Sequence, residues 1–126
     1  MKRLLFAITL ALLPAASLTL LPINSAVAAV TVSKIGDLSA MRKIVADTLV
    51  LVKAGNTKAA IERITAYETA WDKNASKLKK QDKTTWVKLD EASDVALSTV
   101  RYPSATPAEM QKDLSALIAL LDNPSL

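Results

Sequence analysis

The fold is decided by residues 61–78, which read IERITAYETAWDKNASKL. Positions spaced three and four residues apart in this stretch form one face of a helix: Ile61, Ile64, Glu68, Trp71, Ala75 and Leu78. Because all but one of these side chains are apolar or aromatic, the pattern predicts an amphipathic helix with this face turned towards a core. We place the helix at residues 57–80, with Asn56 or Thr57 as its N-cap.

The same spacing recurs in three further segments, at residues 37–54, at 83–102 and between Thr106 and Asn123. Their predicted inner faces are Leu38, Met41, Val45, Thr48 and Val52; then Trp86, Leu89, Ser93, Ala96 and Val100; then Met110, Leu114, Leu117, Ile118 and Leu121. Short breaks between helices favour antiparallel neighbours. The sequence therefore predicts an all-α, antiparallel up-down four-helix bundle over residues 37–126. A three-helix core with a loosely docked fourth helix is the alternative.

The expected helix ends carry recognisable signals. Asp37 and Asp82 are of the residue types that cap helix N-termini, and Gly55 stands where a glycine commonly follows a helix. Residues 106–109 read TPAE, which is a capping box with proline at the first helical position. These signals predict where three of the four segments begin or end.

The N-terminus has the pattern of a secretory signal peptide. Lys2 and Arg3 precede an apolar run over residues 4–21, and Ala26 and Ala28 suit the small-residue positions of a cleavage site. We expect cleavage after residue 28, which leaves a flexible lead at 29–36 and a periplasmic or secreted domain at 37–126. A retained membrane anchor is the alternative, because the run is about long enough to span a bilayer. Membrane contact is expected only through an uncleaved signal peptide.

Composition narrows the chemistry. The chain has no Cys and no His, which excludes His-activated nucleophiles, His or Cys zinc sites and His- or Cys-ligated haem. With two glycines there is no glycine-rich phosphate loop. Residues 1–28 hold two of the 16 basic residues and no acidic one, so the processed chain would carry 14 − 12 = +2 charges. Such a mild, mixed charge gives no indication of nucleic-acid binding, and we predict no cofactor.

Four carboxylates form the constellation that could carry chemistry: Glu68, Asp72, Asp90 and Asp94. They form two i,i+4 acidic pairs with no basic residue three or four positions away in the same helix. A hairpin about residue 81 would bring both pairs to one level. An oxygen-only cluster suits Ca²⁺ or Mg²⁺, and close carboxylates can share a proton. The alternative, which is commoner, is an ion pair from Arg42 or Lys43 to Glu68, with the other three facing water.

Three aromatic residues, Tyr67, Trp71 and Trp86, lie beside these carboxylates and are candidate interaction residues. They could form a platform for a ligand or simply pack in the bundle, which is the commoner role of aromatic residues at helical spacing. Each indole N–H needs an acceptor when buried, and Glu68 or Asp90 could supply one.

Residues 67–72, read as YETAWD, with the second tryptophan segment at 86–90 and residues 100–101, resemble small exported bacterial helical-bundle proteins of unknown function. In those proteins an aromatic-Glu-x-Ala-Trp-Asp run precedes a second tryptophan-bearing helix. The resemblance covers about the middle third of the chain. It implies no activity, but it suggests that Glu68, Trp71, Asp72 and Trp86 act as a unit.

Together these observations predict an exported, non-enzymatic helical bundle that binds a protein or a small ligand. The alternative is a periplasmic accessory protein that binds a divalent cation through the carboxylate cluster. An enzyme that uses the same carboxylates as acid and base is a third hypothesis. Ligand, partner and oligomeric state are not specified by the sequence.

Overall fold

The computed structural model describes residues 34–126 and contains, within that range, four α-helices and no strands. They are α1 (Ser39–Lys53), α2 (Thr57–Gln81), α3 (Lys83–Arg101) and α4 (Pro107–Asp122). The all-α prediction is confirmed, and the largest difference from the predicted boundaries is the start of α1, at residue 39 rather than 37. The expected signal peptide, residues 1–28, and residues 29–33 of the expected lead lie outside the described residues.

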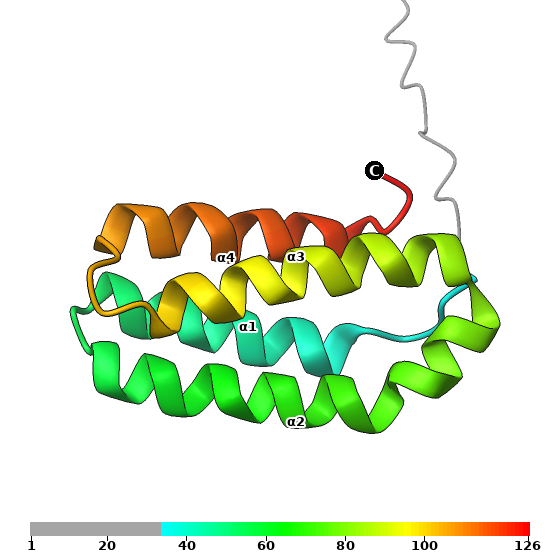
Figure 1. Cartoon of the computed structure of the whole chain (residues 1–126), viewed down its shortest axis with the longest axis horizontal. Coiled ribbons are helices and arrows are strands. Elements are labelled where there is room, and N and C mark those ends of the chain that lie inside the picture. Colours follow the sequence, from blue (N-terminus) through cyan, green and yellow to red (C-terminus); the bar gives the residue numbers. More distant parts are fainter. Residues whose placement is uncertain (1–33) are drawn as a thin grey trace, which may run out of the picture. The chain divides into compact units, whose positions relative to one another are not determined.

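Each helix packs against two neighbours. Helix α1 lies beside α2 and α4, and α3 lies beside the same two helices, whereas the pairs α1–α3 and α2–α4 have no Cα atoms within 8 Å of each other in residues 34–126. Helix α4 is therefore packed on two sides and is not loosely docked. The connections at residues 54–56 and 102–106 lie at one end of the four helices, on the left in Figure 1, and the turn at residue 82 lies at the other end.

The core is built from the predicted faces of α1, α3 and α4. Every predicted inner residue of these three helices is buried or half-buried, and the buried set includes two polar side chains, Thr48 and Ser93. Thr48 satisfies its hydroxyl within its own helix by donating to the Ile44 carbonyl oxygen at 2.9 Å. These residues turn inwards because each stripe repeats at the helical period.

The inner face of α2 differs from the prediction at Glu68, and Ala60, which lies outside the predicted face, is also buried. Tyr67 is fully buried, while Glu68 lies at the edge of the helix with a half-exposed side chain. Both alternatives fit the three-and-four spacing, but a carboxylate is far more expensive to bury than a phenol ring with one hydroxyl. The prediction that Glu68 lies on the inner stripe is therefore wrong, and Tyr67 takes that position.

The helix ends follow the predicted signals with one exception. Asn56, Asp82 and Thr106 accept backbone N–H groups of their helices, and Thr106 forms the full capping box with Glu109. Asp37, in contrast, is not the N-cap of α1, although its carboxylate accepts the Ser39 N–H at 2.9 Å.

Gly55 ends α1 with a positive φ of 74°, a conformation that favours glycine. Its N–H donates to the Val52 carbonyl oxygen, and the next N–H, of Asn56, donates to the Leu51 carbonyl oxygen. This pair of bonds is the Schellman arrangement, and it reverses the chain between α1 and α2.

The packed region begins before residue 37. Ile35, which the sequence analysis places in the flexible lead, is fully buried in the core cluster. Gly36 follows with a φ of 97°, and a Cβ at this position would meet the Gln81 side chain at 3.4 Å. The described part of the lead is therefore fixed against the end of α2. Among the described helices, none is long and apolar enough to cross a membrane.

Candidate functional site

The four candidate carboxylates are not gathered into one site. Asp72 and Asp94 are exposed, while Glu68 and Asp90 are half-buried and each bonds to a different partner. Within residues 34–126 no group of three or more carboxylates lies close enough to hold a metal ion. The predicted alignment of α2 with α3 is nevertheless right, because residues near position 70 of α2 do contact residues near position 90 of α3.

Glu68 pairs with an arginine of α3 rather than with a basic residue of α1. Arg101 Nη2 lies 2.5 Å from Glu68 Oε2 and 3.0 Å from Thr65 Oγ1. The bond from Arg101 lowers the pKa of Glu68. Arg42 and Lys43, the predicted partners, are bonded to Asp122 and Asp47 instead. That prediction is wrong because Glu68 is on the flank of α2 that meets α3, not on the flank that meets α1.

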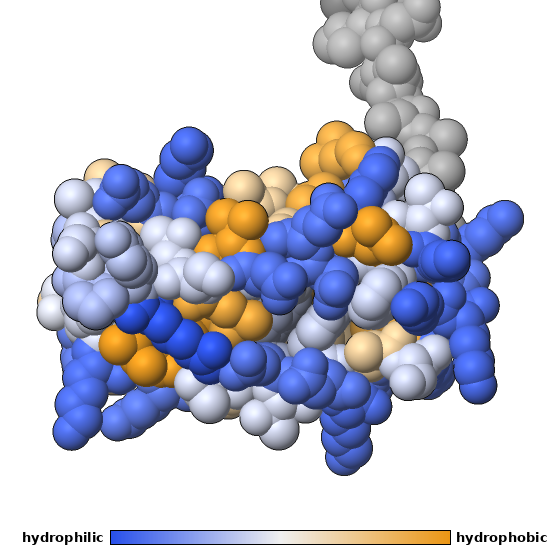
Figure 2. Space-filling model, in the orientation of Figure 1, coloured by the Kyte–Doolittle hydropathy of each residue, from blue (hydrophilic) through white to orange (hydrophobic). Residues whose placement is uncertain are grey.

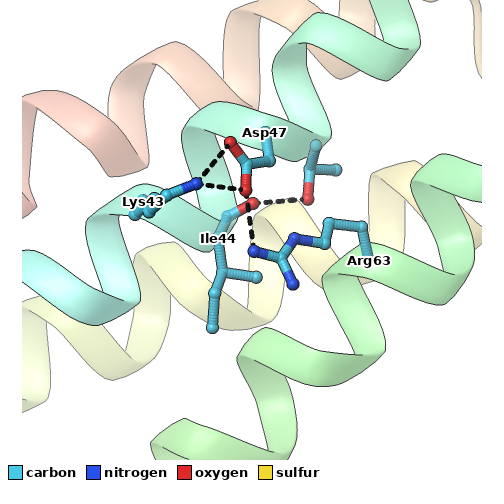
Figure 3. Close-up of polar contacts among 5 residues, drawn as sticks. Lys43, Ile44, Asp47 and Arg63 are labelled. Atoms are coloured by element: carbon cyan, nitrogen blue, oxygen red, sulfur yellow. Dashed lines mark hydrogen bonds and ion pairs between the residues drawn. The ribbon is translucent and has the colours of Figure 1, made fainter.

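The basic and acidic residues of α1 bind across its two interfaces. Figure 3 shows Asp47 between Lys43 of the same helix and Arg63 of α2, with Nζ at 3.0 Å and Nη2 at 2.7 Å from Asp47 Oδ2. The bonds from Lys43 and Arg63 lower the pKa of Asp47. On the other side, Arg42 bonds to Asp122 of α4.

With these contacts each of the four helix interfaces holds at least one polar cross-link. Asp47–Arg63 joins α1 to α2, Glu68–Arg101 joins α2 to α3, and Arg42–Asp122 joins α4 to α1. At the α3–α4 interface, Thr99 Oγ1 donates to Asp113 Oδ2 at 2.7 Å. Such partly exposed contacts add little stability, but each has a partner only in one register, so together they fix how the helices align.

The predicted interaction residues form a stacked series inside the α2–α3 interface. The ring centroids of Tyr67 and Trp71 are 6.2 Å apart, and those of Trp71 and Trp86 are 6.5 Å apart, with interplanar angles of 18° and 10°. Lys79 Nζ lies 4.6 Å from the Trp86 ring centroid, a cation–π distance. Tyr67 and Trp71 are buried and Trp86 is half-buried. Only Trp86 therefore presents any surface to a partner.

The polar atoms of the Tyr67 and Trp71 side chains both form hydrogen bonds. Trp71 Nε1 donates to Asp90 Oδ1 at 2.8 Å, which is one of the two acceptors predicted from sequence. Ser93 Oγ donates to the Leu89 carbonyl oxygen at 2.6 Å, so the 2.6 Å contact between Tyr67 and Ser93 has the phenol as donor. Burial raises the pKa of Tyr67 to about 12, and the nearby Asp90 carboxylate acts in the same direction.

Trp86 differs from the inner rings in one respect. Its Nε1 is buried and has no hydrogen-bond partner among the described residues. The acceptor predicted for each indole is therefore found for Trp71 and not for Trp86. An unpaired buried N–H is destabilising by about 1–3 kcal/mol.

A groove lies at the end of the bundle where α3 passes into α4. Its volume is about 410 Å³. The residues that line it are Ser98, Thr99, Tyr102, Ser104, Ala105, Glu109, Lys112 and Asp113. Tyr102 is 62% exposed, more than any other aromatic residue in the described part of the chain.

Pro103 and the capping box of α4 create this groove. Proline cannot continue α3, so the chain leaves the helix and restarts at Thr106. Glu109 turns back and accepts the Thr106 N–H at 2.7 Å and its hydroxyl at 2.9 Å. These two bonds lower the pKa of Glu109. The Glu109 carboxylate is thus bonded to the residue at the helix start.

Sequence reasoning missed this groove. Over residues 102–106, YPSAT, the sequence predicts only the end of one helix at residue 102 and the start of the next at Thr106. Tyr102 falls at the final position of its predicted helix, and an aromatic residue immediately before a proline break was the available signal. No rule of helix periodicity says which way such a terminal side chain turns.

The other exposed large apolar residues are not among those that line the groove. They are Val50 of α1, Val87 and Val95 of α3, and Leu126 at the C-terminus. On the face drawn in Figure 2, apolar side chains lie in small groups separated by charged ones. Scattered apolar residues of this kind are normal on a monomer surface.

Comparisons of the chain with protein-family models, with curated proteins and with solved structures found no match. Over residues 34–126, the fold and the site geometry define an all-helical four-helix protein with a groove of mixed polar and apolar lining at one end.

Proposed function

We propose that the chain is an exported, non-enzymatic helical-bundle module, and that it binds a small ligand in the groove at the α3–α4 end. The groove volume of about 410 Å³ is the observation that carries this function. It falls within the range of small-molecule sites, roughly 300–1,000 Å³. The exposed Tyr102 and three residues with aliphatic hydroxyls, Ser98, Thr99 and Ser104, line it, which gives the mixture of apolar and polar groups that such sites use.

The arrangement of the carboxylates supports a binding role over catalysis or cation binding. Glu68 is held by Arg101, and Asp90 is held by the Trp71 indole. A general acid–base pair needs one carboxyl with a raised pKa, whereas the pKa of Glu68 is lowered. Asp72 and Asp94 remain exposed on the surface.

We also propose that successive helices alternate in direction, as in an up-down bundle. The connections are short, with a single residue between α2 and α3, and each helix contacts two neighbours and no diagonal partner. Short connections of this kind join antiparallel helices. This ordering places both ends of the groove-forming loop at one end of the bundle.

Export is tested by expressing the full chain with a C-terminal tag in a bacterium and sequencing the N-terminus of the product. We expect the product in the periplasm or the medium, beginning at Ala29. A product that begins at Met1 and stays with the membrane would support the retained-anchor alternative.

Binding is tested on the purified product by a nuclear magnetic resonance screen with sugars, amino acids, organic acids and nucleotides. We expect at least one compound class to shift the amide signals of residues 98–113 in a saturable manner, and to leave residues 67–90 unchanged. Saturable shifts that map only outside residues 98–113 would refute the groove as the site.

A further inference from the structure

We propose that the groove takes a neutral saccharide, with the apolar face of a pyranose ring packed on the Tyr102 ring and the ligand hydroxyls bonded to the groove wall. This inference rests on the proposed function and deepens it by naming the ligand class. It is carried by three properties of the groove: one exposed aromatic face, a wall rich in hydroxyls, and a low net charge.

The aromatic face is the first property. Tyr102 follows the last helical residue of α3, and the residue is 62% exposed. A tyrosine ring offers a broad apolar face with a polar tip, so it suits a ligand that is itself apolar on one face and polar at its edge. A pyranose has this shape, because its axial C–H groups gather on one face and its hydroxyls project around the rim.

Hydroxyls of the wall are the second property. Ser98 and Ser104 are exposed and have no hydrogen-bond partner among residues 34–126, and both line the groove. A hydroxyl both donates and accepts, so it pairs with another hydroxyl in either sense. Asp113 receives the Thr99 hydroxyl on Oδ2, which leaves Oδ1 as an acceptor for a ligand O–H. Lys112 adds a donor on the same side.

Net charge is the third property, and it selects against anions. The lining holds two carboxylates, Glu109 and Asp113, and one ammonium, Lys112, which gives a formal charge of −1. The start of α4 could otherwise attract an anion, but Pro107 has no N–H, Thr106 Oγ1 accepts the Glu109 N–H, and the Glu109 carboxylate lies at this terminus. A phosphate or a carboxylate ligand would therefore meet a carboxylate at the helix terminus and a net negative wall.

The test uses two matched sugars on the purified product of full-chain expression. Glucose and glucuronate share the ring and differ by a carboxylate, and N-acetylglucosamine and a β-1,4-linked glucose tetramer extend the comparison. We expect glucose and N-acetylglucosamine to shift the amides of residues 98–113, and glucuronate to bind more weakly. A tetramer that binds more tightly than the monomer indicates a polymer as the source, and equal binding indicates a free sugar; both support a pyranose site.

Three variants distinguish the contribution of the Tyr102 ring to saccharide binding from that of its hydroxyl and from nonspecific effects of substitution. Tyr102→Leu should weaken saccharide binding at least about tenfold, because it keeps bulk and removes the aromatic face. Tyr102→Phe should retain most of the affinity. Val87→Thr, an exposed change near the start of α3, should bind as the parent does.

The outcomes separate this inference from the function it rests on. If amino acids or organic acids shift residues 98–113 and no sugar does, the saccharide inference is overturned and the binding function stands. If no compound of the panel affects the groove, both fail. Saccharide binding that is unchanged in Tyr102→Leu would also overturn the inference.

Discussion

Two regions of the molecule hold its aromatic and polar side chains in opposite ways. In the α2–α3 interface, Tyr67 and Trp71 are buried and their polar atoms are bonded, to Ser93 and Asp90. In the groove, Tyr102 is exposed, and so are the neighbouring Ser98 and Ser104, whose hydroxyls have no hydrogen-bond partner among residues 34–126. The first arrangement stabilises and aligns helices, whereas the second leaves bonding capacity for a ligand. Whether a tyrosine or tryptophan in a small bundle packs the core or is available to bind a ligand can thus be told only from its surroundings.

The largest effect expected from this comparison is on the free energy of unfolding. Trp71→Ala removes a ring that is 3% exposed and stacked on two others, so we expect a loss of about 3–5 kcal/mol. Tyr102→Ala removes an exposed ring and should change stability by less than about 0.5 kcal/mol. Urea unfolding followed by circular dichroism measures both. Equal losses in the two variants would show that the groove tyrosine is also a packing residue.

The second effect is an alkaline loss of stability that belongs to Tyr67. Burial raises its pKa from 10.0 to about 12, so the folded state keeps the phenol proton after the unfolded state has lost it. The contribution is therefore complete below pH 10 and is lost as pH rises from 10 to about 12, at roughly 1.4 kcal/mol per pH unit. Lysines also titrate in this range, so the measured quantity is the difference from Tyr67→Phe.

That difference isolates the phenol group. Near neutral pH, Tyr67→Phe should be less stable by about 1 kcal/mol, because one buried hydrogen bond is lost. Above pH 10 the gap should shrink and then reverse, since the variant has no proton to lose at this position. In a Tyr102→Phe background Tyr67 is the remaining tyrosine, and its ionisation can be followed by ultraviolet absorbance. A tyrosinate signal that appears at pH 10 in the folded protein would contradict the expected burial.

A third, smaller effect is expected at the edge of the same interface. The pKa of Glu68 is lowered by Arg101, so its contribution is present above the unfolded value of about 4.5 and is lost as pH falls through the folded value. Both side chains are more than a third exposed to solvent, so we expect a coupling energy of only about 0.2–1 kcal/mol. A double-mutant cycle with Glu68→Gln and Arg101→Gln measures it, and the coupling should decrease at high salt. A coupling that is insensitive to salt would argue against an ion pair.

The same comparison shows which parts of the fold and of the candidate site could be predicted from the sequence. Helix bounds and three of the four inner faces were predictable, because apolar periodicity and caps such as Asn56, Asp82 and the capping box act locally. The inner face of α2 was not, since Tyr67 and Glu68 are adjacent and one spacing rule fits both. The ion-pair partner of Glu68 was also not predictable. Glu68 pairs with Arg101 because it lies on the side of α2 that meets α3, and the side on which it lies depends on the rotation of α2 about its axis. The groove depends on where the Tyr102 side chain turns after the helix ends, which no periodic pattern encodes.

The smallest expected effect comes from the third ring of the stacked series, and it is the sharpest test of the hydrogen-bond assignments. Trp71→Phe removes an N–H that bonds to the Asp90 carboxylate at 2.8 Å, so it should destabilise by about 1.5–3 kcal/mol, beyond the effect of the smaller ring. Trp86→Phe removes an N–H that has no partner among the described residues. Loss of an unsatisfied buried donor offsets the loss of ring area, so the free energy of unfolding should stay within about 0.5 kcal/mol of the parent. A loss as large as that of Trp71→Phe would mean that the Trp86 indole has an acceptor in solution, and would place this ring with the bonded members of the series.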